Sequence, residues 1–179
     1  MAKTQRKTVD TVFILIGIVA IILLLIIGAL AWKASDFALS EVRTQLVAQK
    51  IYFPPKGSPA LDPSEFPDLQ QYAGQLVDNG PKAKAYADGF IGRHLEKVAG
   101  GQTYSEVSAA AQLDPTNTQL QQEKQVLFQG ETLRGLLLGD GYAYWTFGTI
   151  AKDAAIALFA SAAAMLILVW LGMLHRSRL

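Results

Sequence analysis

The sequence contains no cysteine among its 179 residues. This absence excludes disulfide bonds, thiolate metal ligands, thiol catalysis and cysteine-linked haem or lipid. Histidine is also scarce, with only His94 and His175 present, so a metal site would need carboxylates to complete its ligand set. The formal net charge is only +1, which provides no basic field for holding nucleic acid. We therefore expect no nucleic-acid partner.

Charged residues make up only 17% of the chain, whereas hydrophobic residues make up 51%. Two runs, 12–32 and 154–174, contain no charged residue at all. A helix of either length would be roughly 31 Å long, which matches a hydrocarbon core of about 30 Å. The sequence therefore predicts two transmembrane helices, 12–32 and 154–174, joined as a helical hairpin.

The flanking charges predict how this hairpin faces. Basic residues gather at the two outer ends of the hydrophobic runs: Lys3, Arg6, Lys7, Arg176 and Arg178. Positive charge is retained on the cytoplasmic side, so segments 1–11 and 175–179 are expected in the cytoplasm. Segment 33–153 holds 11 Lys and Arg against 14 Asp and Glu, a net charge of −3, and is expected outside a plasma membrane.

The sequence of the segment expected outside the membrane predicts helices. Apolar residues continue at helical spacing as far as Ile51, so the first helix is expected to extend outward until Pro54 and Pro55 stop it. The proline-rich stretch 52–80 predicts an irregular connection. Within it we expect one short helix, 63–77, with Asp62 as N-cap and Pro63 in the first helical position.

Helix signals recur in the remainder of the segment. A helix is expected from Pro81 to a glycine C-cap at 100–101. Capping-box patterns at 103–106 and 116–119 each predict a new helix start, and the last helix is expected to bend near 139–141 and enter the second hydrophobic run. No alternating strand pattern is present. The predicted fold is an all-α membrane protein with two transmembrane helices and a small helical extracytoplasmic domain between them.

No pattern in the chain points to catalysis. His94 and His175 are expected on opposite sides of the membrane and could not share a metal, and the carboxylates are scattered singly. We therefore expect no enzyme, no cofactor of its own, no metal and no soluble small-molecule substrate. A membrane enzyme would require an acid–base or metal cluster around His94.

Two further groups of residues are candidates for contacts. One is a set of aromatic residues expected at the outer membrane interface, where either an interfacial belt or a lipid or quinone site could form: Tyr142, Tyr144, Trp145 and Phe147. The other is a set of small residues expected to let helices pack closely: Gly17, Ala20, Gly28, Ala157, Ala160, Ser161 and Ala164.

Several stretches together resemble a known family. These are the uncharged first run, VRTQLVAQKIYFPPKG at 42–57, AKAYADGFIGRHLEKVAGGQTYSEVS at 83–108, and GETLRGLLLGDGYAYWTFGTIA at 130–151. Over nearly its full length the chain is similar to an actinobacterial two-span membrane family that includes the prokaryotic respiratory supercomplex association factor.

This resemblance implies a function. It implies a non-catalytic accessory subunit that associates with and stabilises a respiratory supercomplex of the cytochrome bcc complex with cytochrome c oxidase. The implied partners are integral membrane respiratory subunits and membrane lipids. The alternative that the residues leave open is a cell-envelope module, unrelated to respiration, that binds or senses lipid or quinone.

Overall fold

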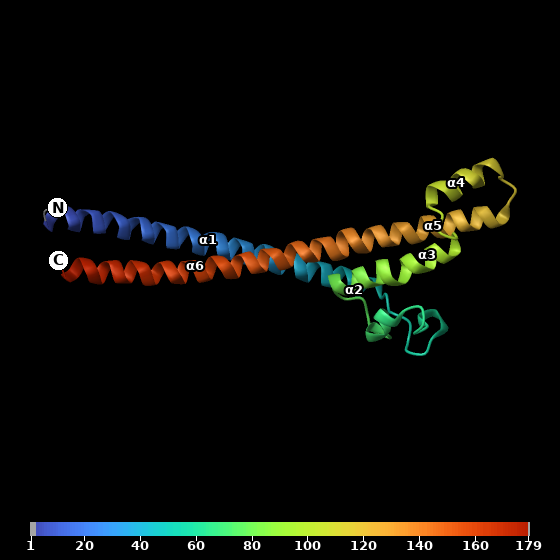
Figure 1. Ribbon diagram of the computed structural model, residues 1–179, viewed down its shortest axis with the longest axis horizontal. Helices are drawn as coiled ribbons and strands as arrows, with labels where there is room; N and C mark the ends of the chain where they lie inside the picture. Colours follow the sequence, from blue (N-terminus) through green and yellow to red (C-terminus); the bar gives the residue numbers. More distant parts are fainter. Residues whose placement is uncertain (1–2, 179) are drawn as a thin grey trace. The chain divides into compact units, whose positions relative to one another are not determined.

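The computed structural model describes residues 3–178, and this part of the chain is helical without a β-strand (Figure 1). The only sheet-like contact in it is one antiparallel bridge between Tyr52 and Leu76. Two continuous helical stretches, Gln5–Gln49 and Thr118–Arg178, are long and apolar enough to cross a membrane, judged by length and composition. The all-helical prediction is thereby confirmed, and the two stretches are compatible with a membrane protein.

The chain divides into two compact units. The first, here called the hairpin unit, comprises Met1–Phe37 and Phe147–Leu179, and the second, here called the head unit, comprises Ala38–Thr146. The head unit is thus somewhat shorter than the segment 33–153 expected from the hydrophobic runs. Helices α1 (Lys3–Gln49) and α6 (Tyr144–Arg178) each contribute to both units.

In the hairpin unit the two apolar helices run antiparallel. A Cβ added at Gly17 would lie 2.4 Å from Val169, and one added at Gly28 would lie 2.8 Å from the ring of Phe159. Ascending positions on α1 therefore meet descending positions on α6, so the beginning of α1 and the end of α6 lie at the same end of the unit (Figure 1).

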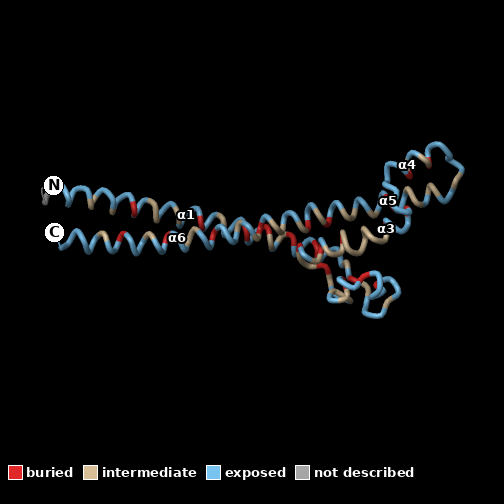
Figure 2. Tube along the Cα trace, in the orientation of Figure 1, coloured by how far each residue is buried: buried red, intermediate tan, exposed pale blue. Residues whose placement is uncertain are grey.

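Most of the buried and half-buried positions of the hairpin unit follow one another in steps of four and three along both helices, and Figure 2 shows them recurring along each helix. An average spacing of about 3.5 residues is that of an antiparallel coiled coil. We call this set of positions the seam: Asp10, Ile14, Gly17, Ile21, Leu24, Gly28, Ala31 and Ser35 on α1, and Gly148, Ala151, Ala155, Leu158, Ala162, Met165, Val169 and Gly172 on α6.

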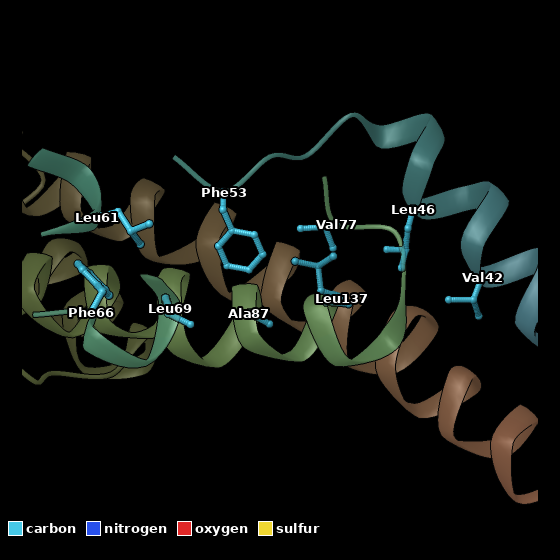
Figure 3. Packing of buried hydrophobic residues seen from close by; sticks show 10 residues of the cluster. Val42, Leu46, Phe53, Leu61, Phe66, Leu69, Val77, Ala87 and Leu137 are labelled. Atoms are coloured by element: carbon cyan, nitrogen blue, oxygen red, sulfur yellow. The ribbon is translucent and has the colours of Figure 1, made fainter. Parts of the chain in front are cut away.

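The head unit has a conventional apolar core. Figure 3 shows Phe53, Leu61, Phe66 and Leu69 beside helical backbone, and all four are at most 2% exposed. The ring of Phe53 stacks on Tyr72 at 5.2 Å and meets Tyr86 edge-on at 5.0 Å. Burial of these large side chains is the main stabilising contribution in this unit.

The connection between α1 and the next helix corrects one prediction. Two 3₁₀ turns, η1 (Pro59–Leu61) and η2 (Pro67–Tyr72), replace the helix expected at 63–77. The Oδ1 of Asp62 accepts from the backbone N–H and the hydroxyl of Ser64, at 2.8 and 2.6 Å, and caps no helix. Pro67 explains the failure, because it lacks an N–H and disfavours helical backbone at Phe66.

The next helices begin and end where the sequence predicts. Asn79 caps α2 (Gly80–Lys84), which continues through a π-helical stretch η3 (Ala85–Gly92) into α3 (Arg93–Val98). Gly100 and Gly101 follow with φ values of 57° and 83°, a left-handed conformation that favours glycine. The predicted capping box between Thr103 and Glu106 is present at the start of α4 (Tyr104–Leu113).

The last helix of the head unit starts one residue later than expected and has another cap. Asn117, not Thr116, caps α5 (Thr118–Leu136), and its side chain accepts from Leu120 N–H at 3.2 Å. The expected bend at 139–141 is a π-helical stretch, η4 (Leu137–Ala143), which leads directly into α6. An Asn side chain caps as well as Thr, and here it stands one residue closer to the helix.

Candidate functional site

The seam brings together some of the small residues that were expected to pack, and leaves out others. Gly17 and Gly28 are buried and Ala20 is half-buried on α1. On α6 the buried small residues are Gly148, Ala155 and Ala162. Gly17 and Gly28 therefore permit the close helix contact that small residues were expected to provide.

The expected small residues of α6 lie on a different face from the seam. We call them the small-residue face, and all four are exposed: Ala157, Ala160, Ser161 and Ala164. Ser161 donates its hydroxyl hydrogen to the carbonyl of Ala157 at 2.8 Å and contributes no cross-helix hydrogen bond. The contact with α1 is made by the seam, which repeats every seven residues from Gly148, so these four residues remain candidates for packing against another helix.

The four aromatic residues expected at the membrane interface occupy different environments. Trp145 packs against the head core, and a Cβ added at Gly80 would lie 2.5 Å from its side chain. Tyr142 is half-buried, with the ammonium of Lys84 5.0 Å from its ring centre. Tyr144 is 39% exposed within the head unit, and Phe147 is 54% exposed within the hairpin unit. Two of these aromatic side chains therefore help to hold α2 in place.

A network of charged groups surrounds η3 in the head unit. The Nε of Arg134 donates to the carbonyl of Ala87 at 3.1 Å, and its other nitrogens contact Asp88 at 3.3 Å and Glu131 at 2.9 Å. Widened π-helical turns leave carbonyls open to such side-chain donors. Arg134 thereby ties α5 to η3 across 47 residues of sequence.

The electrostatics of this network follow from its geometry. The Lys84 ammonium lies 2.9 Å from Asp88 and, together with Arg134, holds the pKa of the Asp88 carboxyl below its ordinary value. Hydrogen bonding to Asp88 in turn raises the pKa of Lys84. A crevice of about 470 Å³ opens beside the network, lined by residues that include Glu96, Tyr104 and Glu131.

His94 is engaged in packing on the other side of α3. Its ring stacks on Phe66 at 5.2 Å and approaches Phe90 at 4.4 Å, and its Nδ1 lies 2.8 Å from the Phe90 carbonyl. The adjacent Arg93 makes a two-pronged ion pair with Asp68, with distances of 2.8 and 2.9 Å. Within residues 3–178, no group of three or more His, Asp or Glu side chains lies close enough to hold a metal ion.

The seam includes one charged residue, Asp10, that no motif in the sequence singles out. Asp10 lines a crevice of about 190 Å³ between α1 and α6, and its Oδ2 is buried without a hydrogen-bond partner. The signal was available in the spacing, because Asp10 is one heptad before Gly17 on the same face.

Comparison with protein-family models, with curated proteins and with solved structures found no match to this chain.

Proposed function

We propose that the chain is a membrane-anchored, non-catalytic accessory subunit that associates with a respiratory supercomplex of the cytochrome bcc complex and cytochrome c oxidase. Both apolar helices cross the plasma membrane, both ends face the cytoplasm, and the head unit lies outside. The partner assignment rests on the resemblance of the chain to the actinobacterial two-span family, and the membrane anchoring rests on the hairpin unit.

The observation that carries the anchoring is the distribution of side-chain size in the hairpin unit. The seam is rich in glycine and alanine, whereas large apolar side chains face outward, including Phe13 at 69% and Leu30 at 63% exposure. In a water-soluble protein these large apolar side chains would lie in the core, whereas in a membrane protein they face the lipid. The unit is therefore suited to a hydrocarbon environment or to contact with other transmembrane helices.

The use of polar groups in the head unit supports an architectural role. The Thr103 hydroxyl and Glu106 carboxylate cap a helix, and Arg93 pairs with Asp68 across 25 residues. Arg134 joins α5 to η3. These side chains maintain the shape of the head unit, which is what an accessory subunit presents to its partners.

In this proposal the small-residue face of α6 receives a helix of a partner subunit. Small side chains let the backbones of two transmembrane helices approach closely, and this face is not used by the seam. The net charge of −3 on segment 33–153 is too small to steer a partner strongly, so shape determines the fit.

The test is a pull-down of the tagged full chain from its native membranes in mild detergent, read by mass spectrometry and by a haem difference spectrum. Oxidase subunits with b-, c- and a-type haems are the expected result. A haem-free eluate dominated by envelope or lipid-handling proteins would overturn the proposal and favour the lipid- or quinone-binding alternative.

Matched variants separate partner binding from folding. Ala164→Leu enlarges an exposed residue of the small-residue face, whereas Ala162→Leu enlarges a seam residue that is 2% exposed. We expect Ala164→Leu to reduce the co-purified haem while the hairpin unit stays intact. Unchanged haem recovery with Ala164→Leu would contradict the assignment of this face to a partner helix.

A further inference from the structure

The two ends of the hairpin unit differ in charge. Because α1 and α6 run antiparallel, the beginning of α1 and the end of α6 lie together at one end of this unit (Figure 1). We call it the basic end, after four basic residues that are exposed there: Arg6, Lys7, Arg176 and Arg178. The only acidic residue in segments 1–11 and 175–179 is Asp10. Four basic residues against one acidic residue give this set a net charge of +3.

The opposite end of the hairpin unit is electrically balanced. Lys33 and Lys152 are exposed there, but so are Asp36 and Asp153, so these four residues have no net charge. The Lys152 ammonium also lies 5.9 Å from the centre of the Trp32 ring. Within the hairpin unit, the excess of positive charge is therefore confined to the basic end.

The contact between the helices fixes the level of the basic residues along the unit. A Cβ added at Gly172 would lie 3.5 Å from Ile14, so these two residues stand at one level. At about 1.5 Å per residue, the basic residues lie about 6–12 Å beyond that level, and Val12, where the hydrophobic run begins, lies about 3 Å beyond it. When the unit spans a bilayer, the basic residues are thus about 3–9 Å outside the hydrocarbon, a range that covers the head-group layer of about 5–8 Å.

The protein itself does not neutralise the basic end. Within residues 3–178, the salt bridges involve none of its four basic residues. Three of the four are arginines, and a guanidinium donates two parallel hydrogen bonds to the free oxygens of a phosphodiester. The exposed side chains of the basic end are therefore complementary to the phosphate groups found at their own depth in a membrane.

We propose that the basic end binds anionic phospholipids in the leaflet that surrounds it. The guanidinium groups donate to the lipid phosphate, and the net negative charge of the lipid gives the selectivity. Phosphatidylcholine has the same phosphate but also carries a cation, so a positive surface attracts it less. The proposal rests on the membrane-spanning part of the proposed function, because that insertion places the basic end at head-group depth.

The test uses the purified full chain in lipid nanodiscs that contain equal amounts of phosphatidylglycerol and phosphatidylcholine. Lipids retained on the protein are counted by native mass spectrometry after release from the discs. We expect phosphatidylglycerol to be retained about fivefold over phosphatidylcholine, the effect of roughly one basic residue near a charged membrane surface. Because salt screens exposed charges, the preference should fall when the discs are equilibrated at about 1 M salt instead of about 0.1 M.

Two double variants remove charge from one helix at a time. Arg6→Gln with Lys7→Gln, and Arg176→Gln with Arg178→Gln, should each lower the preference by about half or more. Arg176→Lys with Arg178→Lys keeps the charge and should keep most of the preference. A merely structural role of these arginines would not predict that rescue.

The matched control is Arg43→Gln with Lys56→Gln, which removes one arginine and one lysine that are exposed on the head unit. It changes the net charge of the chain as much as Arg6→Gln with Lys7→Gln does, and should leave the lipid preference unchanged. Circular dichroism of each variant in the discs confirms that the helices are retained.

Three results would overturn the proposal. Equal retention of the two lipids by the parent chain would show that the basic end does not select anionic lipid. An equal loss of preference in the head-unit control would show that the charge of the whole chain acts without a site. Equal lipid retention, together with loss of an acidic protein from pull-downs of the Arg176→Gln and Arg178→Gln variant, would show that the basic end contacts a partner protein instead.

Failure of this proposal is distinguishable from failure of the proposed function. The lipid measurement needs only the purified chain, so a pull-down without respiratory subunits does not affect it. Insertion into the discs without lipid selectivity overturns the lipid proposal alone, whereas a chain that does not enter the discs overturns both.

Discussion

The two units of this chain solve the problem of burial in opposite ways. The head unit buries large side chains, such as Phe53 and Leu61 at 1% and 0% exposure, and keeps its ion pairs at the surface. The hairpin unit buries Gly28 and Ala155 and exposes Ile16 at 59%. One chain therefore contains one unit with large side chains inside and one with small side chains inside, and the second distribution is compatible with a membrane protein.

This contrast shows how little apolar content alone says about packing. In the head unit, removal of apolar area from water supplies the driving force, so large residues lie inside. In a bilayer that force between helices is absent, and close van der Waals contact between small residues replaces it. The contrast can be tested unit by unit.

The largest effect is expected from Phe53→Ala in the head unit. Removing a buried ring that contacts Tyr72 and Tyr86 should cost about 3–5 kcal/mol of stability. Hydrogen exchange read by mass spectrometry should show lost protection in peptides from the head unit alone. Tyr52→Ala, at a residue 56% exposed, is the control. Equal loss of protection in both units would show that they unfold together and would break the comparison.

Gly17→Leu should disturb the hairpin unit by steric overlap with Val169. Overpacking of a close contact costs about 1–3 kcal/mol. Because the chain has no cysteine, a reporter disulfide between Ile14→Cys and Gly172→Cys can be introduced without interference. We expect the reporter to form readily in the parent chain and poorly with Gly17→Leu. Val19→Leu, at an exposed position, should leave the yield of the reporter disulfide unchanged. Equal disulfide yields in the parent chain, Gly17→Leu and Val19→Leu would contradict the seam.

Thr103→Ala removes the hydroxyl half of the capping box at the start of α4. Loss of a helix cap costs about 1 kcal/mol. The change should lower the thermal midpoint of the head unit, measured by circular dichroism with the hairpin unit in detergent. Ser105→Ala alters a neighbouring hydroxyl outside the box and serves as the control. A Thr103→Ala chain as stable as Ser105→Ala would show that the box contributes nothing.

The smallest effect is expected for the ion pair between Asp68 and Arg93. The hydrogen bond from Arg93 holds the pKa of Asp68 below its ordinary value of 3.8. The pair therefore stabilises the folded head unit fully above that ordinary value, and the contribution is lost as pH falls through the lowered pKa. For an exposed pair it is worth about 0.2–1 kcal/mol. Asp68→Asn should reduce stability at neutral pH and flatten the acid side of the profile, and an unchanged profile would contradict this.

Local signals in the sequence located most helix ends. The Thr103–Glu106 box and the Gly100–Gly101 stop act within four residues, so no distant contact is needed to find them. The helix expected at 63–77 failed because Pro67 outweighed the favourable start at Asp62 and Pro63. Two prolines four residues apart cannot share one regular helix interior.

The candidate contacts were harder to place, for a physical reason. Nearly every side of 154–174 is apolar, so composition does not say which face meets the other span, and the structure places the seam there rather than the small-residue face. Likewise the contact of Trp145 with Gly80, 65 residues away along the chain, has no signal in the local sequence. Such contacts are decided by the segment of the chain that packs against each residue.

The sequence by itself determined the helical class, the two hydrophobic runs and the capping box at Thr103, because each depends on residues that are neighbours along the chain. Tertiary structure decided the heptad seam, the crevice at Asp10 and the tie from Arg134 to Ala87, since each requires two segments in register across space. Local hydrogen bonds and helix periodicity depend on residues a few positions apart. Burial of a residue depends instead on which distant segment of the chain packs against it.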